Sequence, residues 1–527
     1  MTGKPTSSKN RPTGVTDPPD FPLRVAAIDI GSNAIRFLAA EFSAPQRHRV
    51  IDQIRAPVRL GHDVFLTGRL TPEAMDRAVE TIATFRERIE RLDVTRYRAV
   101  ATSAVRDSRN GRELINRIRL ETGIEVETIT GSEEARLAHV AVRSRIDLST
   151  RKWVVADLGG GSVEVSLVDE NGIYWTESRG MGSVRLLEEL AVAGDEPGRF
   201  RRRLEEYTAT INIPLAEEER PAGFIATGGN IEALARMIRG ETDANGVARV
   251  PVSALRSTIE ALAKLSYQQR VEELGLREDR ADVILPAAMV YERLAELAEM
   301  DEVLVPFVGI KDGIIIDLVD ELLPEEGRNS RHDRIAWAGA IALGERYHFD
   351  APHGRHVATL ALSLFDQLTD VHELDADSRR ILMVAALLHD IGTFIAYRKH
   401  HKHSQYIIAE SDLPGFSQSE IQVIANVARY HRRSTPSDNH DSYTKLRESD
   451  RDRVVRLAAI LRLADALDRE HRQAVSEVRA RHDGGKVHLE LKGDGDLLLE
   501  RWALEKKAEM FEKVFKLPLK AVDSVPG

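Results

Sequence analysis

Two short segments of the chain place a carboxylate, glycines and small polar side chains directly after a run of apolar residues. Each segment begins with an aspartate, Asp29 or Asp157. Glycine lets backbone N–H groups approach a phosphate closely, serine and asparagine add hydrogen-bond donors, and the carboxylate can hold a hydrated divalent cation. This order of residue types therefore indicates phosphate binding together with a cation. The residues that follow the two aspartates are Gly31, Ser32 and Asn33 in the first segment and Gly159, Gly160, Gly161 and Ser162 in the second.

A third glycine turn and an arginine strengthen this interpretation. Gly228, Gly229 and Asn230 follow another strand-like run. One such turn alone is more often a plain tight turn, but three of them together favour a phosphate cleft. Arg106 comes shortly after a strand, and its guanidinium can bind a phosphate with two parallel hydrogen bonds. The alternative is an arginine that pairs with Asp107 at the start of a helix.

The two aspartate segments belong to an internal repeat. Residues 27–40 resemble residues 155–168, with Asp29 aligned with Asp157 at an offset of 128 positions. Each copy has the pattern of a strand, a tight polar turn and a returning strand. The chain around the copies alternates strand-like and helix-like runs, which is typical of α/β layering. We therefore expect a duplicated α/β domain whose two turns face each other across a cleft.

Composition limits the classes of protein that the chain can represent. It has 527 residues, a formal net charge of −10 and no cysteine. The acidic balance argues against a nucleic-acid or membrane-surface binder, so a polyanion would need a local basic lining. The lack of cysteine excludes thiol catalysis, disulfides and zinc–cysteine sites. No charge-free apolar stretch is long enough to span a membrane. We expect a cytoplasmic protein whose residues 1–22 form a proline-rich disordered tail.

The C-terminal part of the chain has a different pattern. Fourteen of the 17 histidines lie between His332 and His488, in a region of long helical periodicity. The run 486–492, followed by Gly-Asp-Gly at 493–495, predicts a small hairpin before a terminal helix. The predicted organisation is a tail at 1–22, α/β domains at 23–138 and 139–325, and a mostly helical domain at 326–527.

Five motifs together resemble those of the Ppx/GppA family of exopolyphosphatases and guanosine pentaphosphate phosphatases, within the actin, Hsp70 and sugar-kinase superfamily. They follow the order and spacing of the family across residues 24–320, and the helical remainder is similar to the longer members. The resemblance implies two duplicated actin-like (RNase H-like) domains of the ATPase type that flank a cleft, then a mostly α-helical HD-like domain, and a homodimer. The motifs are Asp29-Ile-Gly-Ser-Asn-Ala-Ile-Arg36, Thr102-Ser-Ala-Val-Arg106, Thr130-Gly-Ser-Glu-Glu-Ala-Arg136, Asp157-Leu-Gly-Gly-Gly-Ser-Val-Glu164 and Thr227-Gly-Gly-Asn230.

The resemblance also implies roles for individual side chains. Glu134 matches the family's general base. Asp157 and Glu164 are candidates for holding Mg²⁺, or Mn²⁺, or for orienting water, with Asp29 on the opposite turn. Arg36 is a further candidate for phosphate binding. Without the resemblance, the sequence predicts only an outward-facing strand residue at Glu164.

The position of Glu134 predicts its ionisation. Ser132 is expected to cap the helix and to place Glu133 and Glu134 in its first turn. A helix N-terminus favours an ionised carboxylate, so we expect a base that is deprotonated at pH 7. Acidic residues in a first turn are also ordinary helix-start chemistry, which is the alternative interpretation.

The third domain of the family resembles the HD superfamily, whose metal-dependent phosphohydrolases use an early histidine, a His-Asp pair and a late aspartate. Imidazole and carboxylate ligands suit Mn, Fe, Zn or Mg, so a second metal is one expectation. A structural domain whose aspartates cap helices is the other. The basic run 398–403 is either a solvated helix face or a lining for a polyanion. The matching residues are His353, His389, Asp390 and Asp465, with His431 and either His401 or His403 as further candidates.

These observations predict an exopolyphosphatase, a hydrolase that releases terminal orthophosphate from inorganic polyphosphate with Glu134 as base and Mg²⁺ as cofactor. A guanosine pentaphosphate (pppGpp) 5′-phosphatase is the close alternative, because both reactions break a terminal phosphoanhydride. Three alternatives from other classes stay open: a regulator that binds polyphosphate or (p)ppGpp without hydrolysis, a phosphohydrolase centred on the histidine domain, and an ATP-dependent kinase.

Overall fold

The computed structural model divides the chain into two compact units, Met1–Arg331 and His332–Gly527. Almost all of the predicted tail at 1–22 lies outside the described residues. Within the part of the chain that is described, no helix is long and apolar enough to cross a membrane. The described residues are 6–7, 21–149, 151–193, 197–214, 220–322, 325–432, 434–493 and 497–523.

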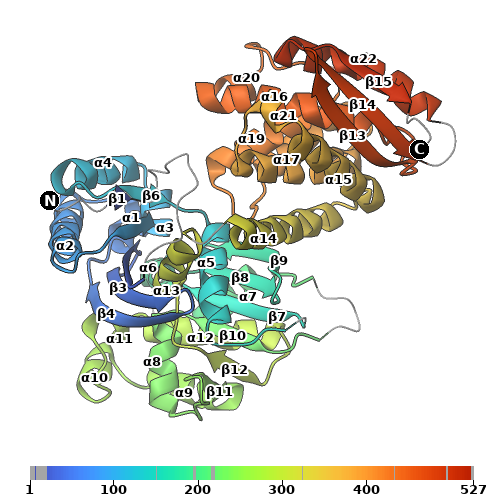
Figure 1. The fold of residues 1–527 in the computed structure, drawn as a ribbon. Coiled ribbons are helices and arrows are strands. Elements are labelled where there is room, and N and C mark those ends of the chain that lie inside the picture. Colours follow the sequence, from blue (N-terminus) through green and yellow to red (C-terminus); the bar gives the residue numbers. More distant parts are fainter. Residues whose placement is uncertain are drawn as a thin grey trace. The chain divides into compact units, whose positions relative to one another are not determined.

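The first sheet of unit 1 has the strand order β1-β5-β2-β3-β4, with β6 paired to β5 (Figure 1). β2 and β3 form an antiparallel hairpin, and β5 runs parallel to β2. On α2, Thr71 accepts a hydrogen bond from the N–H of Ala74 and Pro72 occupies the first helical position, as the Thr-Pro-Glu sequence predicts. The strands are Thr6–Ser7 (β1), Leu23–Ile30 (β2), Ile35–Ala44 (β3), Arg47–Ala56 (β4), Arg96–Ala101 (β5) and Val126–Thr128 (β6), and the helices are Gly61–Thr67 (α1), Pro72–Arg91 (α2), Ser103–Asp107 (α3) and Gly111–Thr122 (α4).

The second sheet has the order β11-β12-β10-β7-β8-β9. Its β7–β8 hairpin repeats the β2–β3 hairpin, which confirms the predicted duplicated α/β architecture. The strands are Trp153–Leu158 (β7), Val163–Val168 (β8), Ile173–Arg179 (β9), Phe224–Thr227 (β10), Ala248–Pro251 (β11) and Glu302–Val305 (β12), and the helices are Ser183–Ala193 (α6), Pro197–Thr208 (α7), Gly229–Ile238 (α8), Val252–Ala263 (α9), Tyr267–Glu272 (α10), Glu278–Ala281 (α11) and Ile284–Leu297 (α12).

Two helices, α5 (Gly131–Arg143) and α13 (Ile310–Asp320), pack against each other at the first sheet. Their apolar residues, among them Leu137 and Ile314, share one buried cluster with Val25 of β2 and Leu38 of β3. The N-cap of α5 is Thr130, whose Oγ1 accepts a hydrogen bond from the N–H of Glu133. The prediction that Ser132 caps this helix is therefore wrong, because the helix begins two residues earlier.

Unit 2 is built around one apolar core shared by its helices and a three-stranded sheet, β13-β14-β15. The hairpin turn lies at Gly484 and Gly485, both with positive φ. It therefore does not lie at the predicted 493–495, of which 494–495 fall outside the described residues. The elements are Glu325–Arg346 (α14, which begins in unit 1), Ala351–Gln367 (α15), Thr369–His372 (α16), Ala376–Leu388 (α17), Ile391–Phe394 (η1), His400–Ala409 (α18), Gln418–Arg429 (α19), Asp441–Thr444 (α20), Glu448–Ala466 (α21), Val475–Asp483 (β13), Lys486–Gly493 (β14), Leu498–Phe515 (α22) and Leu519–Asp523 (β15).

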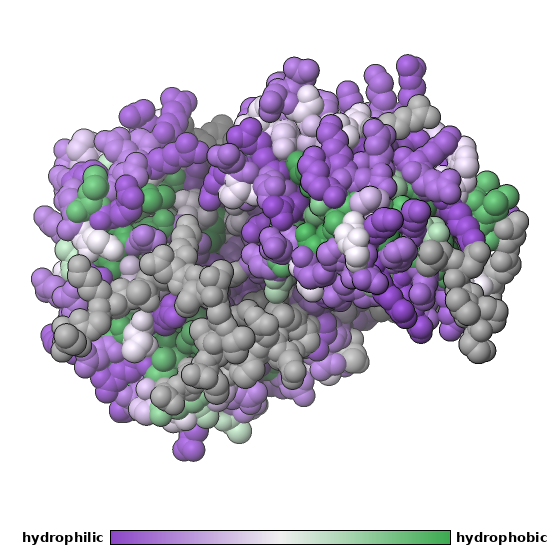
Figure 2. Space-filling model, turned by 45° about the horizontal axis from the view of Figure 1, so that its top comes forward, coloured by the Kyte–Doolittle hydropathy of each residue, from purple (hydrophilic) through white to green (hydrophobic). Residues whose placement is uncertain are grey.

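Figure 2 shows that hydrophilic residues cover most of the visible face, with small hydrophobic patches between them. Exposed apolar side chains are ordinary on protein surfaces and are informative only when they form large patches. The buried polar groups are therefore more informative about function than the exposed apolar residues.

The close contact between α5 and α13 leads to a test of how α5 is positioned. A Cβ added at Gly313 would lie 2.0 Å from the carbonyl oxygen of Leu137, so Gly313→Ala must push the helices apart. We expect the free energy of unfolding to fall by about 1–3 kcal/mol, measured by urea denaturation. Gly309→Ala at the N-cap of α13 is the control, because nothing lies within 4 Å of its Cβ. Equal stability of the two variants would contradict the packing described here.

Candidate active site

The two repeated turns of unit 1 lie against each other. A Cβ added at Gly160 would sit 3.0 Å from Cβ of Ser32 and 3.2 Å from the backbone nitrogen of Asn33. Gly182 packs still more closely on the second turn, because its Cβ would meet Gly161 N at 2.2 Å. Only glycine allows the two backbones to approach so closely at these positions.

The turns keep backbone donors available. The carbonyl of Gly160 accepts hydrogen bonds from the N–H groups of Val184 and Arg185, at 2.8 and 3.0 Å. Within the described residues, no acceptor is found for the backbone N–H groups of Ser32, Asn33, Gly160 and Gly161. Unpaired N–H groups on adjoining turns form a concavity that suits an anion.

The hairpin register places equivalent residues opposite the two aspartates. Asp29 pairs in register with Arg36, and Asp157 pairs with Glu164. Since 36 and 164 also differ by 128, the repeat carries a cation at this position in one copy and a carboxylate in the other. Arg36 Nη1 donates to Asp29 Oδ2 at 2.8 Å, so the first hairpin neutralises its own aspartate, whereas the second holds two carboxylates.

Both carboxylates of the second hairpin are buried. Thr227 Oγ1 donates to Asp157 Oδ1 at 2.5 Å, and Ser178 Oγ donates to Glu164 Oε1 at 2.8 Å. The other oxygen of Glu164, Oε2, is buried and has no hydrogen-bond partner among the described residues. A buried carboxylate oxygen without a donor is costly unless a ligand or cation meets it.

Glu134 lies in the first turn of α5 and is only 4% exposed. Arg106, from α3, reaches it with an Nη1 to Oε1 hydrogen bond of 2.5 Å and also donates to the carbonyl of Ile129. Asp107 lies farther away, at 3.6 Å from Nε of Arg106. Within the described residues Nη2 of Arg106 makes no hydrogen bond, so part of the guanidinium is available to a ligand.

The carboxylates raise one another's pKa values. Burial raises the pKa of Glu134 to about 7, with Asp157 and Asp29 acting in the same direction and Arg106 opposing them. Burial also raises the pKa of Glu164, helped by the charges of Glu134 and Asp157. Desolvation thus opposes the effect of the helix N-terminus and shifts the pKa of Glu134 upward, in the direction opposite to the one expected from the helix N-terminus.

A buried ion-pair network fixes the first turn of α5. Glu133, next to Glu134, accepts hydrogen bonds from Arg136 and from Arg98 of β5. Both arginines also contact Asp317 on α13, Arg136 at 2.6 and 2.8 Å and Arg98 at 3.1 Å. Burial alone would raise the pKa of Glu133, but the two arginines outweigh burial and lower it. Two adjacent glutamates thus have opposite environments.

The third glycine turn joins the same region. Gly228 has φ +111°, a conformation that side chains rarely adopt, and its Cβ would lie 2.6 Å from the carbonyl of Leu158 at the end of β7. Asn230 Nδ2 donates to Ser183 Oγ at 3.1 Å, while Gly229 lies beside a guanidinium nitrogen of Arg280. All three predicted turns therefore come together.

Sequence reasoning missed the cations around these turns. Arg280 on α11 lies over Gly229, and burial together with the charges of Arg277 and Arg55 lowers its pKa to about 10. Arg55, at the end of β4, forms an ion pair with Asp279. No local sequence motif identifies these arginines. The sequence indicated only that an acidic chain needs some local cations to bind a polyanion, without saying which residues they are.

In unit 2 the predicted histidines and aspartates also converge. His353 and His389 form one group of potential metal ligands with Asp465, and Asp390 forms another with His431. The remaining member of the second group is His400, and a third group joins His353 and Asp390 with His471. The sequence analysis named neither His400 nor His471. The extra candidates, His401 and His403, belong to none of these groups.

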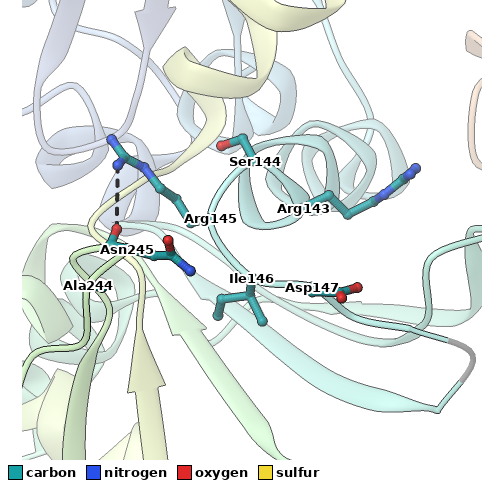
Figure 3. Close-up of a pocket in the computed structure, with 7 residues that line it drawn as sticks. All are labelled: Arg143, Ser144, Arg145, Ile146, Asp147, Ala244 and Asn245. Atoms are coloured by element: carbon teal, nitrogen blue, oxygen red, sulfur yellow. Dashed lines mark hydrogen bonds between the residues drawn. The ribbon is translucent and has the colours of Figure 1, made fainter. Parts of the chain in front are cut away.

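A separate hollow lies at the opposite end of α5 (Figure 3). Arg145 donates a hydrogen bond of 3.5 Å to the backbone carbonyl of Asn245 there. Its lining contains none of the predicted site residues. The candidate site is therefore at the N-terminal end of α5. The hollow is lined by Arg143, Ser144, Arg145, Ile146, Asp147, Ala244 and Asn245.

The raised pKa of Glu134 predicts how stability depends on pH. A carboxyl with a folded-state pKa of about 7 and an ordinary value of 4.5 holds its proton more tightly in the folded chain. The bound proton therefore stabilises the folded state. This stabilisation is complete below pH 4.5 and is lost as the pH rises through 7. Glu134→Gln should therefore raise the free energy of unfolding at pH 8, by up to roughly 3 kcal/mol, and the gain should shrink toward zero at pH 4.5.

The neighbouring residue supplies the control for this urea-denaturation experiment. Glu133→Gln removes a carboxylate whose pKa is lowered by Arg136 and Arg98, so it should destabilise the protein at pH 8. If Glu134→Gln destabilised the protein as much as Glu133→Gln does, the electrostatic description of Glu134 would be wrong.

Comparisons with known proteins agree with this architecture. The Ppx/GppA phosphatase family matches residues 43–322, and the Ppx/GppA phosphatase domain III matches residues 336–509. The chain is 27% identical, over 88% of its length and 91% of the relative's, to a guanosine-5′-triphosphate,3′-diphosphate pyrophosphatase from Vibrio vulnificus (strain YJ016). It is 28% identical, with the same coverage, to the protein of that name from Vibrio parahaemolyticus serotype O3:K6.

Among solved structures, an exopolyphosphatase from Cytophaga hutchinsonii ATCC 33406 is similar to this chain. It has 27% sequence identity and a TM-score of 0.53, and the match covers 56% of this chain and 98% of that one. The family match to residues 43–322 covers more than half of the 527 residues and includes the second and third of the glycine turns described above. The chain belongs to the Ppx/GppA phosphatase family.

Proposed function

We propose that this protein is an exopolyphosphatase that hydrolyses the terminal phosphoanhydride bond of inorganic polyphosphate. The observation that carries the proposal is the placement of Glu134, which is buried beside Arg106 and interacts electrostatically with Asp29 and Asp157, the aspartates that precede two of the glycine turns. Phosphoryl transfer depends mainly on positioning and on electrostatic stabilisation, and this arrangement supplies both.

In the proposed reaction, Glu134 accepts a proton from a water molecule whose oxygen attacks the terminal phosphorus. The bond from that phosphorus to the bridging oxygen breaks, and the shortened polyphosphate leaves with the bridging oxygen. A base with a pKa near the working pH combines ionisation with proton affinity, and the pKa of about 7 for Glu134 meets this requirement. Arg106 contacts the base through Nη1 and keeps Nη2 for the phosphate.

The second hairpin fits a magnesium ion that retains part of its water shell. Glu164 has a buried oxygen without a donor, and Asp157 lies opposite Glu164 in the register. In the described part of unit 1 no three metal-ligating side chains lie within 4.8 Å of one another, so direct coordination by several carboxylates is not built in. Mg²⁺ commonly uses one or two carboxylates together with substrate phosphates, and there it neutralises charge on phosphate oxygens. Asp29 is less suited, because Arg36 already pairs with it.

Guanosine pentaphosphate is the second candidate substrate. The observation in its favour is that two curated relatives named guanosine-5′-triphosphate,3′-diphosphate pyrophosphatase match 88% of this chain, including both units. Hydrolysis of guanosine pentaphosphate would also break a phosphoanhydride bond, so the same base and the same turns would support that reaction. Phosphate release from both substrates in parallel ranks the two candidates.

Removal of the base tests the proposal. Glu134→Gln keeps the size of the side chain and removes the proton acceptor, so we expect kcat for phosphate release to fall by about 10²–10⁴ with Mg²⁺ present. The KM should change little, because the phosphate-binding turns are untouched. Glu113→Gln is the matched control, because Glu113 also lies in a first turn, that of α4, but is exposed. Its activity should equal that of the wild type.

Two other results would contradict the proposed mechanism. Activity that survives in Glu134→Gln would place the reaction elsewhere, with the histidine cluster of unit 2 as the next candidate. No release from either substrate by the wild type would favour a protein that binds phosphate chains without hydrolysis.

The pH profile is an independent test. If Glu134 acts as the base, only its ionised form is active, so kcat/KM should fall about tenfold per pH unit below a pKa near 7. The measurement is initial phosphate release between pH 5 and 9 at constant ionic strength. A profile that stays flat down to pH 5 would show that a base with an ordinary carboxyl pKa acts instead.

A further inference from the structure

One arginine of unit 1 contacts three separate segments around the phosphate-binding turns. Arg185 lies on α6, and its Nε donates a hydrogen bond of 2.9 Å to the carbonyl oxygen of Gly161 in the second turn. Its Nη2 donates to Oδ2 of Asp107 on α3 at 2.5 Å. Its guanidinium carbon lies 4.2 Å from the centre of the Phe65 ring on α1, within the range of a cation–π interaction. Because α1 and α3 pack on the first sheet and Gly161 follows β7 of the second, Arg185 connects the two halves of unit 1.

The side chain of Arg185 completes the support of the glycine turn. The carbonyl oxygens of Gly159 and Gly160 accept hydrogen bonds from backbone N–H groups at the start of α6, which have no acceptor within the helix. The third carbonyl, that of Gly161, is held by the arginine side chain instead. A peptide group is planar and trans, so a fixed Gly161 carbonyl also fixes the direction of the N–H group of Ser162.

The second contact of Arg185 controls the residue next to Arg106. Asp107 directly follows Arg106, and its Oδ1 lies 3.6 Å from Nε of Arg106, which is too far for a hydrogen bond. The other oxygen of Asp107 accepts from Arg185. The side chain of Asp107 is 39% exposed, so without Arg185 it would be free to turn toward Arg106. It would then compete with Glu134 and with a phosphate for the same guanidinium.

A second pair of side chains fixes the position of α6 against α1. Glu188 lies one turn after Arg185, and its Oε1 lies 2.5 Å from Nδ1 of His62. His62 in turn lies one turn before Phe65. Two side chains of α6 therefore face two side chains of α1. The same surface reaches the glycine turn, because a Cβ added at Gly161 would lie 2.4 Å from Cζ of Phe65.

We propose that Arg185 is a positioning residue for phosphate release. It holds the Gly161 peptide group and keeps Asp107 away from Arg106. This inference rests on the proposed function, because the turn and Arg106 are the proposed phosphate ligands. It adds that one side chain holds the ligands from both halves of unit 1 in register with each other.

Loss of Arg185 should affect the reaction more than the fold. The side chains of Arg185 and Asp107 are 22% and 39% exposed, and ion pairs near the surface contribute little to stability. A misplacement of about 1 Å at a reacting group, in contrast, can lower the rate about 10²-fold. We therefore expect slow turnover in a protein whose unfolding temperature stays close to that of the wild type.

Kinetics of full-length variants test the proposal. Arg185→Gln should lower kcat for phosphate release from polyphosphate by about 10–100-fold and change KM less than about threefold, because the phosphate ligands are still present. The double variant Arg185→Gln/Asp107→Asn should be at least about threefold faster than Arg185→Gln, because the competing carboxylate is gone. Arg249→Gln is the matched control and should equal the wild type, because Arg249 pairs with Glu302 between two strands and contacts none of the turns.

Two kinetic results would overturn the proposal. A double variant no faster than Arg185→Gln would do so, because loss of a purely structural ion pair is not repaired by removal of its second member. A rise in KM with an unchanged kcat would also do so, because Arg185 would then be a ligand of the substrate.

A crystal structure of Arg185→Gln tests the geometry without any need for hydrolysis. A carboxylate oxygen of Asp107 should lie within about 3 Å of the Arg106 guanidinium in this variant, whereas Asp107 should stay with Arg185 in the wild type. An Asp107 that keeps its distance from Arg106 in the variant would overturn the proposal even if the wild type hydrolyses polyphosphate. Absence of phosphate release by the wild type would contradict the proposed function alone, because this structural readout does not depend on it.

Discussion

The ion-pair network of Arg98, Arg136, Glu133 and Asp317 is the constraint on which the position of Glu134 depends. It ties the first turn of α5 both to β5 and to α13, and every member is buried or nearly so. With α5 held in this way, Glu134 cannot move toward water to relieve its desolvation. A buried charge is tolerated when partners are fixed around it, and here the fixed partners belong to its neighbour, Glu133. As a result, Glu133 holds the helix turn in place through its ion pairs, whereas Glu134 can gain or lose a proton.

The turns around Glu134 depend on a second constraint, the close approach of backbones. Gly160, Gly161 and Gly182 meet at distances that admit no side chain. α6 occupies the carbonyl oxygens of Gly159 and Gly160, whereas the N–H groups of Gly160 and Gly161 have no acceptor among the described residues. The proposed anion site thus consists mainly of peptide groups, whose charge does not change with pH.

Much of this arrangement was predictable from the sequence, and the rest depended on packing. The repeat of Asp29 and Asp157, the glycine turns and the Thr71 cap are local patterns, so they could be recognised without a fold. The pKa of Glu134 depends on burial by distant segments, and Arg280 comes from a short helix with no motif. The choice among His400, His401 and His403 depends on helix phase, since successive residues point about 100° apart around a helix.

The charge difference between equivalent positions of the repeat has a consequence for symmetry. Positions 36 and 164 occupy the same place in two copies of one hairpin, yet one carries a guanidinium and the other a carboxylate. The two hairpins share one backbone pairing pattern, but the second hairpin is the more negative by two formal charges. The two hairpins are therefore electrostatically unequal. A linear polyanion that contacted both of them would meet a different field at each one, so its two possible directions would differ in energy.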